Sequence, residues 1–226
     1  ATKPATQVDA ETSITIAGNR DDFVSRGGHK LAGALDTFSD IKVEGKRCLD
    51  AGASTGGFTD VLLRRGADCV VAADVGYGQL AWEIQQNPKV VILDRTNIRH
   101  LTGELVGDPI DLVVADLSFI SLTLVLPALA AVSKPEADYV LMVKPQFEVG
   151  RERLGAGGVV RDPALRKAAV IEVAESAYDV GLGTLGVTAS PLPGPAGNVE
   201  YFLWLRRGAP AIDEAALDRA IEIGPQ

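Results

Sequence analysis

Five apolar runs in this chain each end in a charged residue, and this repeat constrains the fold more than any other feature. The charged residues are Asp50, Asp74, Asp94, Asp116 and Lys144. Runs of Val, Ile, Leu and Ala without polar alternation are typical of a parallel sheet that helices cover on both faces. Because the carboxyl ends of parallel strands meet at one edge, where such sheets bind ligands, we expect all five side chains to face one crevice.

A glycine-rich turn follows the first of these strands. Residues 50–57 read Asp-Ala-Gly-Ala-Ser-Thr-Gly-Gly, and an amphipathic helix over 58–65 comes next. Gly52 and Gly56 allow the backbone to turn tightly and to approach a ligand closely. This strand–loop–helix unit indicates a nucleotide-binding site, although such a turn also serves simply to join a strand to a helix.

Composition limits the classes of protein that this chain can belong to. Its 226 residues, 46% of them hydrophobic, suffice for one sizeable domain plus a short extension. The net charge of −8 argues against a protein that grips nucleic acid through its overall charge, but not against local basic patches. Cys48 and Cys69 lie in predicted strands and indicate core residues in a reducing, cytoplasmic compartment. No run approaches the roughly 18 apolar residues that span a bilayer, so we expect no membrane insertion.

The remaining pattern predicts five further helices and two further strands. The helices are expected over 26–38 (with Ser25 as N-cap), 79–86, 122–133, 163–180 and 213–223, and the strands over 185–189 and 198–206. Residues 146–162 contain four glycines and three arginines without periodicity, which predicts a mobile, functional loop. The chain begins without methionine, and we expect an N-terminal piece to precede it.

The connection between the last two strands fixes the direction of the final one. Residues 190–197 are too few for a crossover helix, because a parallel connection needs about a dozen residues or more. The last strand should therefore be antiparallel and begin at the edge where the others end, which places Glu200 in the same crevice. Seven strands with the seventh reversed differ from a dehydrogenase sheet. They predict an α/β, Rossmann-like class I methyltransferase fold that uses S-adenosylmethionine.

Six short stretches carry a more specific signal. They are Ser-Arg-Gly-Gly-His-Lys (25–30), Asp-Ala-Gly-Ala-Ser-Thr-Gly-Gly-Phe (50–58), Ala-Asp-Val-Gly-Tyr-Gly (73–78), Ala-Asp-Leu-Ser-Phe (115–119), Val-Lys-Pro-Gln-Phe-Glu (143–148) and Gly-Asn-Val-Glu-Tyr (197–201). With these stretches the chain resembles the TlyA/hemolysin A family of ribosomal RNA methyltransferases, whose main domain is similar to FtsJ-type ribose methyltransferases. The resemblance covers essentially everything from about Phe23. It implies that residues 1–19 are the end of an S4-type RNA-binding domain, 20–25 a linker, and 26–226 the methyltransferase domain.

The resemblance also implies a chemistry, namely methyl transfer to a ribose 2′-hydroxyl of ribosomal RNA. The family's Lys-Asp-Lys-Glu tetrad falls on Lys30, Asp116, Lys144 and Glu200. A lysine acts as a base only where burial or a nearby cation lowers its pKa, so we expect Lys144 to take the hydroxyl proton with help from Lys30. Asp116 and Glu200 would position the two amines. The rest of catalysis is then proximity of methyl group and oxygen.

The expected ligand-binding residues follow from the same comparison. For the cofactor S-adenosylmethionine they are Asp50, Gly52, Ala53, Ser54, Thr55, Gly56, Phe58, Asp74, Val75, Asp94, Arg95, Thr96, Asp116 and Phe119. The glycine turn would pass under the amino-acid end, Asp74 would bind ribose hydroxyls, and 94–96 would lie near adenine. For RNA they are Arg20, Arg26, Arg151, Arg153 and Arg161, as phosphate contacts. The partners implied are ribosomal subunits, with cytidines of both as targets, and no metal is implied.

Four alternatives stay open from the sequence alone. Base methyltransferases commonly carry Asn/Asp-Pro-Pro-Tyr/Phe after the fourth strand, but residues 116–119 here read Asp-Leu-Ser-Phe. The older family name suggests a membrane-lysing hemolysin, which no spanning segment supports. A ribosome-binding assembly factor without catalysis and an NAD-dependent dehydrogenase are the other two. None of these residues encodes which nucleotide is modified.

Overall fold

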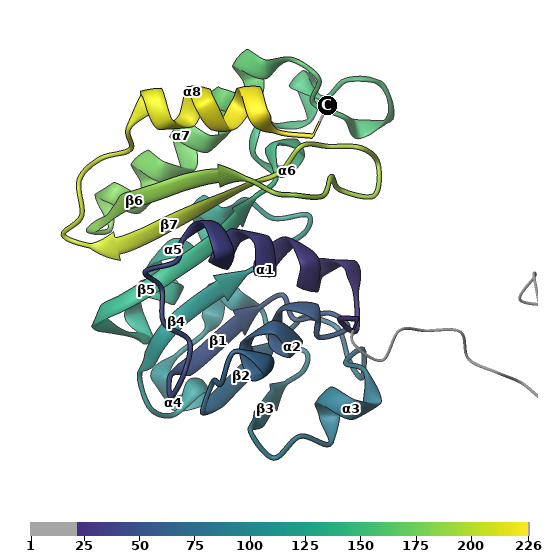
Figure 1. The fold of residues 1–226 in the computed structure, drawn as a ribbon, viewed down its shortest axis with the longest axis vertical. Coiled ribbons are helices and arrows are strands. Elements are labelled where there is room, and N and C mark those ends of the chain that lie inside the picture. Colours follow the sequence, from purple (N-terminus) through teal and green to yellow (C-terminus); the bar gives the residue numbers. More distant parts are fainter. Residues whose placement is uncertain (1–21, 226) are drawn as a thin grey trace, which may run out of the picture.

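A seven-stranded sheet forms the centre of the molecule (Figure 1). The computed structural model describes residues 22–225, apart from the side chains of Arg151 and Ala156. The strand order is β3-β2-β1-β4-β5-β7-β6. The predicted remnant of an RNA-binding domain over 1–19 lies outside the described residues, as do the first two residues of the predicted linker.

The directions of the strands confirm the predicted fold class. Strands β1 to β5 pair in parallel, while β7 is antiparallel to both β5 and β6. The bounds are β1 Arg47–Ala51, β2 Cys69–Ala73, β3 Val90–Leu93, β4 Ile110–Ala115, β5 Ser133–Val143, β6 Leu182–Ala189 and β7 Tyr201–Arg207. The sheet is therefore that of a Rossmann-like methyltransferase with the last strand reversed.

Helices cover both faces of this sheet because alternate strand residues point to opposite sides. The helices are α1 Arg26–Thr37, α2 Gly57–Arg64, α3 Trp82–Gln85, α4 Gly103–Val106, α5 Leu126–Ala131, α6 Pro145–Glu148, α7 Pro163–Asp179 and α8 Glu214–Ile223, with short 3₁₀ helices η1 Ile98–His100, η2 Leu122–Leu124, η3 Arg151–Arg153 and η4 Ala156–Gly158. Cys48 belongs to the apolar cluster that includes residues of α1 and α2, whereas its neighbour Leu49 belongs to the cluster that includes residues of α5, α7 and α8. Each face of the sheet thus has its own apolar core.

Several sequence-based boundaries were wrong. Strand β3 is not buried, since it ends the sheet and leaves Val91 and Ile92 each 39% exposed. The helix predicted over 79–86 is reduced to α3. The one predicted over 122–133 is divided into η2 and α5, with a proline in the first turn of α5, where proline is tolerated. Ser25 occupies the N-cap position of α1 but makes no capping hydrogen bond. The region 146–162, expected to be without structure, contains α6, η3 and η4.

One buried carboxylate, Asp138, holds the amino-terminal end of the sheet together. Its oxygens accept hydrogen bonds from Lys46 Nζ (3.0 Å), Trp204 Nε1 (2.9 Å) and the Arg206 guanidinium (2.7 and 2.9 Å). Burial raises its pKa, but these donors outweigh burial and hold the pKa below its ordinary value. The cluster joins the loop before β1 to β5 and β7.

We expect Asp138→Ala to lower the free energy of unfolding by about 2 kcal/mol, because it leaves the indole N–H and two cations without their acceptor. Urea unfolding at neutral pH measures the loss. The exposed Asp40→Ala serves as the control and should change stability little. Equal stability of the two variants would contradict the role given to Asp138.

Candidate active site

The polar residues predicted to share a crevice do meet at the carboxyl edge of the sheet. Asp74, Asp94, Asp116 and Lys144 directly follow β2, β3, β4 and β5. Glu200 directly precedes β7, and Val143 pairs with Tyr201 in the antiparallel ladder, so Glu200 lies across from Lys144. Asp50 differs, because it lies inside β1 and is wholly buried.

Two lysine–carboxylate pairs form at this edge. Lys144 Nζ lies 2.6 Å from Asp116 Oδ1 and donates a hydrogen bond to Ser118 Oγ at 3.0 Å. Lys30 Nζ lies 2.6 Å from Glu200 Oε2. The second pair is the more buried: 8% of the Lys30 side chain and 1% of Glu200 are exposed, against 11% of Lys144 and 25% of Asp116. The structure therefore brings the four predicted catalytic residues into two ion pairs.

Close packing around α1 places Lys30 beneath Glu200. Gly33 on α1 faces Pro191, and a Cβ at Gly33 would lie 2.8 Å from the proline ring. A Cβ at Gly194 would lie 2.7 Å from Glu200 Oε1. The absence of side chains at these two glycines lets α1 and the 190–197 turn approach the start of β7. This helix-to-turn contact explains how a residue before the first strand joins the site.

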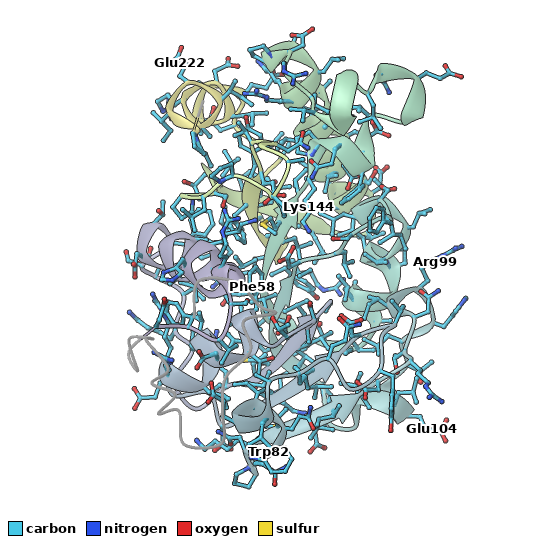
Figure 2. The ribbon with its side chains drawn as sticks, turned by 90° about the vertical axis from the view of Figure 1, so that its right-hand side faces the viewer. Phe58, Trp82, Arg99, Glu104, Lys144 and Glu222 are labelled. Atoms are coloured by element: carbon cyan, nitrogen blue, oxygen red, sulfur yellow. The ribbon has the colours of Figure 1, made fainter. Side chains whose placement is uncertain are left out.

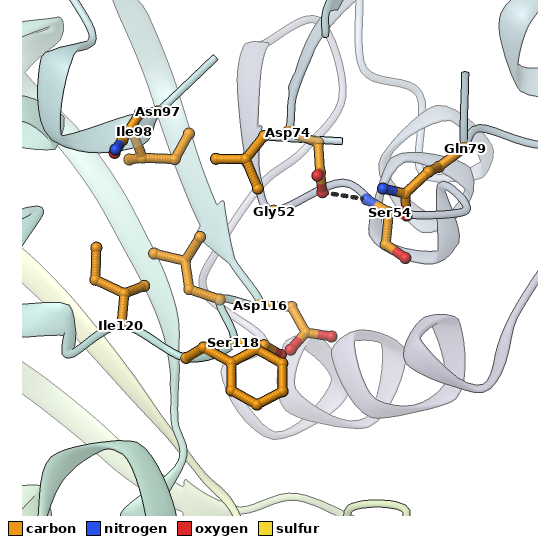
Figure 3. A pocket seen from close by; sticks show the side chains of 12 residues that line it. Gly52, Ser54, Asp74, Gln79, Asn97, Ile98, Asp116, Ser118 and Ile120 are labelled. Carbon is orange, nitrogen blue, oxygen red and sulfur yellow. Dashed lines mark hydrogen bonds between the residues drawn. The ribbon is translucent and has the colours of Figure 1, made fainter. Parts of the chain in front are cut away.

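Two cavities adjoin at the Asp116–Lys144 pair. The first, of about 470 Å³, is shown in Figure 3 and is lined by the predicted residues Gly52, Ser54, Asp74, Val75, Asp116 and Phe119. The second, of about 930 Å³, has Lys144, Glu200, Phe147 and Asn198 among its lining residues. Figure 2 shows Lys144 near the middle of the molecule, with Trp82 and Glu222 towards its two ends. Residues 118–120 and Asn97 line both cavities.

The glycine turn forms one wall of the first cavity. Gly52 has φ +88°, and a Cβ there would lie 2.7 Å from the carbonyl oxygen of Asp116, so only glycine fits without displacement of that strand end. Asp74 accepts hydrogen bonds from the backbone N–H groups of Ser54 (2.9 Å, drawn in Figure 3) and Gly76 (2.7 Å). This carboxylate thus ties the turn after β1 to the turn after β2.

Not every predicted cofactor residue lines this cavity. Ala53, Thr55 and Phe58 line a smaller recess of about 90 Å³ beside it, whereas Asp50, Gly56, Asp94, Arg95 and Thr96 are absent from the lining of both. Asp94 instead accepts a hydrogen bond from Gly78 N–H at 2.9 Å, and the Arg95 guanidinium lies 4.4 Å from the centre of the Tyr77 ring. Sequence reasoning missed the lining residues Gln79, Asn97, Ile98, Leu117, Ser118 and Ile120.

None of the predicted RNA-binding arginines whose side chains the structure describes lines the second cavity. Arg26 is exposed and donates to Pro193 O at 3.2 Å, Arg153 is exposed and donates to Val149 O at 2.8 Å, and Arg161 is exposed. Arg20 and the side chain of Arg151 lie outside the described part of the chain. Sequence reasoning missed Arg99, which is exposed and lines the second cavity. Its place just beyond the carboxyl end of β3 was the available signal.

Comparison with known proteins agrees with this geometry. Residues 23–207 match the family model described as FtsJ-like methyltransferase. The chain belongs to this family. It is 58% identical over its whole length to the 16S/23S rRNA (cytidine-2′-O)-methyltransferase TlyA of Mycobacterium tuberculosis, of which it covers 86%. It is 40% identical to Hemolysin A of Brachyspira hyodysenteriae, over 80% of this chain and 75% of that protein. A solved structure of a hemolysin-named protein from Streptococcus thermophilus superposes with a TM-score of 0.85 at 38% identity, covering 91% of this chain and 75% of the other.

Membership in the FtsJ-like family confirms the predicted enzyme class. No helix within residues 22–225 combines the length and the apolar character needed to cross a bilayer. Over the same residues, no three His, Cys, Asp or Glu side chains are grouped so as to hold a metal ion.

Asp50 is a buried acid beneath the glycine turn of this FtsJ-like domain. Thr59 Oγ1 donates to its Oδ2 at 2.7 Å, while Oδ1 has no hydrogen-bond partner among the described residues. Burial raises the pKa of Asp50 to about 7, the hydrogen bond from Thr59 opposes this, and the negative charges of Asp116 and Asp74 add to the rise. The group therefore titrates near neutral pH in the folded protein.

We expect Asp50→Asn to become more stable relative to the unchanged protein as the pH rises. Between the unfolded pKa near 3.8 and the folded pKa near 7, only the folded state binds the proton, so rising pH removes stability that the asparagine variant keeps. Between about pH 5.5 and about pH 8 the difference in unfolding free energy should grow by about 2 kcal/mol. Denaturant unfolding at both pH values measures it, with the exposed Asp68→Asn as control. Parallel pH profiles for Asp50→Asn and the unchanged protein would refute the assignment.

Proposed function

We propose that this protein transfers a methyl group from S-adenosylmethionine to a ribose 2′-hydroxyl of ribosomal RNA. The proposed targets are cytidines of the small and large subunits, as named for the relative that is 58% identical. The observation that carries the proposal is that two cavities with different charged linings adjoin at the Asp116–Lys144 pair. The first is lined by the carboxylates Asp74 and Asp116, and the second by Arg99, Lys144 and Glu200. A cationic donor suits the first cavity, and an anionic RNA suits the second.

The first cavity fits the donor in shape as well as charge. The absent side chain at Gly52 leaves a cradle beside Asp116 for the amino-acid end. Each Asp74 oxygen accepts one backbone N–H and keeps a free lone pair for a ribose hydroxyl. Asn97 and Ile98, which line this cavity, are proposed to face the adenine in place of residues 94–96. The bound donor would supply an electrophilic methyl group on a sulfonium.

Lys144 is the proposed acceptor of the hydroxyl proton. It lines the second cavity and contacts Asp116, which lines the first. Only a neutral amine can accept this proton, so Lys144 Nζ is proposed to react after losing its ammonium proton to the solvent in the open cavity. The ribose oxygen would then take the methyl group, the methyl–sulfur bond and the O–H bond would break, and the hydroxyl proton would pass to Nζ, leaving a neutral thioether. Lys30 acts through Glu200, because their 2.6 Å ion pair fixes the carboxylate that lines the acceptor cavity opposite Lys144. The rate then comes mostly from holding the reacting atoms in line.

Six arginines are proposed to bind the RNA phosphates. They are Arg26, Arg99, Arg153 and Arg161, together with Arg20 and Arg151. The target ribose would leave its stack to enter the second cavity, since a nucleotide within a helix does not reach a recessed site. Because the whole chain carries a net charge of −8, RNA binding should depend on local positive charges such as these arginines.

We expect Lys144→Ala to lower kcat for methyl transfer by about 100-fold or more, because it removes the proton acceptor. Lys30→Ala should lower kcat less and also reduce stability, because Glu200 then stays buried without its partner. Tritiated methyl incorporation into isolated ribosomal subunits over a range of pH, at a temperature where both variants are folded, measures the effects. Lys42→Ala, an exposed lysine, is the control. Near-normal turnover of Lys144→Ala would remove Lys144 from the mechanism.

Asp74→Ala should weaken binding of S-adenosylmethionine by about tenfold, since it removes a carboxylate from the cavity wall and releases the Ser54 turn. Calorimetric titration measures the dissociation constant, with NAD as the competing ligand class. Asp94→Ala is the matched comparison, because Asp94 follows the neighbouring strand but does not line the cavity. If Asp94→Ala weakened the donor more than Asp74→Ala, the proposed placement would be reversed.

A further inference from the structure

The carboxylate of Glu148 joins the two segments that carry the Asp116–Lys144 pair. Glu148 lies at the end of α6, which begins directly after Lys144. Its Oε2 accepts a hydrogen bond from Ser121 Oγ at 2.5 Å, and its Oε1 accepts one from Leu122 N–H at 3.0 Å. Both carboxylate oxygens thus accept hydrogen bonds from residues at the carboxyl end of the segment that begins at Asp116. Below, these two hydrogen bonds are called the Glu148 strut.

The segment held by the strut, residues 116–121, separates the two cavities. We call it the partition loop. Ser118, Phe119 and Ile120 line both the first and the second cavity. At its start Asp116 contacts Lys144, and Ser118 accepts a hydrogen bond from the same amine. Any displacement of this loop therefore moves the donor wall and the acceptor wall together.

The conformation of the partition loop needs an external restraint. Phe119 has φ +63°, a left-handed conformation that is strained for a bulky residue, and its side chain is 91% exposed. Its ring contacts the α6 residue Phe147, with ring centres 5.0 Å apart. Because Phe119 is exposed, packing of its own side chain does little to hold this strained conformation. The neighbouring backbone on both sides must therefore be held by other contacts. Asp116 and Ser118 hold one side, and Ser121 and Leu122 hold the other.

The hydrogen bonds from Ser121 and Leu122 also hold the Glu148 side chain in place. Burial raises the pKa of Glu148 above its ordinary value. The hydrogen bonds from Ser121 and Leu122 oppose this rise without cancelling it, and the charge of Glu172 adds to it. A half-buried carboxylate loses much of its solvation, so it is stabilised here mainly by these two donors. Ser121 is also the N-cap of η2, where its Oγ accepts from Thr123 N–H at 3.1 Å. The strut thereby fixes the start of η2 as well.

We propose that Glu148 is a positioning residue for methyl transfer, acting through Ser121 and Leu122 to hold the partition loop in register with Lys144. It lines neither cavity, so it is not assigned a contact with donor or RNA. The inference rests on the proposed function, and it adds a residue outside the lysine–carboxylate pairs. Glu148 and Phe147 therefore have different roles in the same short helix. Phe147 lines the acceptor cavity, whereas Glu148 contacts the partition loop and the start of η2.

The test uses four variants of the full chain. Three are the single changes Glu148→Ala, Glu148→Gln and Ser121→Ala, and the fourth combines Glu148→Ala with Ser121→Ala. Glutamine keeps an acceptor for Leu122 N–H and gains an amide donor for Ser121 Oγ, so it should retain at least about half of the wild-type kcat. Glu148→Ala should lower kcat about tenfold while the dissociation constant of S-adenosylmethionine changes by less than about threefold. The double variant should resemble Glu148→Ala alone, because both changes break the same contact. Glu172→Ala, a neighbouring exposed acid on α7, is the control.

Amide hydrogen exchange supplies a readout that does not depend on the RNA substrate. In Glu148→Ala, exchange should accelerate at Leu122 and within 116–124, with the rest of the sheet unchanged. Normal kcat in Glu148→Ala, additive effects with Ser121→Ala, or acceleration spread over the whole protein would each overturn the inference. Turnover by the unchanged protein is measured first. If that protein binds the donor but methylates no subunit, the proposed function fails, and the exchange pattern still decides whether the strut holds the loop. If Glu148→Ala does not fold, Glu148→Gln and Ser121→Ala carry the same comparison.

Discussion

The antiparallel pairing of β7 with β5 is the constraint on which the site depends. Because Val143 and Tyr201 are opposite each other, the residue that leaves β5 and the residue that enters β7 meet at one edge. With β7 in the parallel sense, Glu200 would lie at the far edge and Lys144 would face no acid from that strand. The short 190–197 turn enforces the reversal, and Gly33 on α1 lets this helix pack closely against Pro191 of the turn and bring Lys30 to the same place. One chain reversal therefore assembles a site from residues 170 positions apart.

The Lys30–Glu200 pair is better explained by function than by stability. Withdrawing two charges from water costs several kcal/mol for each ion, and the mutual attraction of the pair often only offsets that cost. An apolar pair of similar volume would serve the core at least as well. The pair here lies beneath the acceptor cavity and presents one side of the Glu200 carboxylate to it. Burial of this kind restricts the carboxylate to one orientation, which is what a group that positions a reacting oxygen requires.

Sequence patterns were sufficient for the sheet and for most of its edge, because strand ends and a short final turn follow from local rules. They placed Asp116, Lys144 and Glu200 together without any coordinates. They did not select Lys30, whose place depends on how α1 packs against the 190–197 turn, a contact between distant segments. Nor did they find Asn97, Ser118 and Arg99 on the cavity walls, since loop residues carry no periodicity. The expected run 94–96 does not line the first cavity for a related reason: after an edge strand the chain turns so that Asp94 and Arg95 contact the turn around Tyr77.

The two cavities also differ in the charged groups that line them. The charges of Asp116 and Asp74 both raise the pKa of the buried Asp50, so the three carboxylates are close enough to repel one another. A cation in the neighbouring cavity would relieve that repulsion, which supports the proposal that a sulfonium donor binds there. The same field disfavours RNA phosphates, which supports the proposal that the nucleic acid binds on the side that Lys144 and Arg99 line. Lys144, in contact with Asp116 and open to the acceptor cavity, lies where the two fields meet. In the proposed function, an acidic protein can thus act on RNA because the phosphates meet Lys144 and Arg99 and not the carboxylates Asp74 and Asp116.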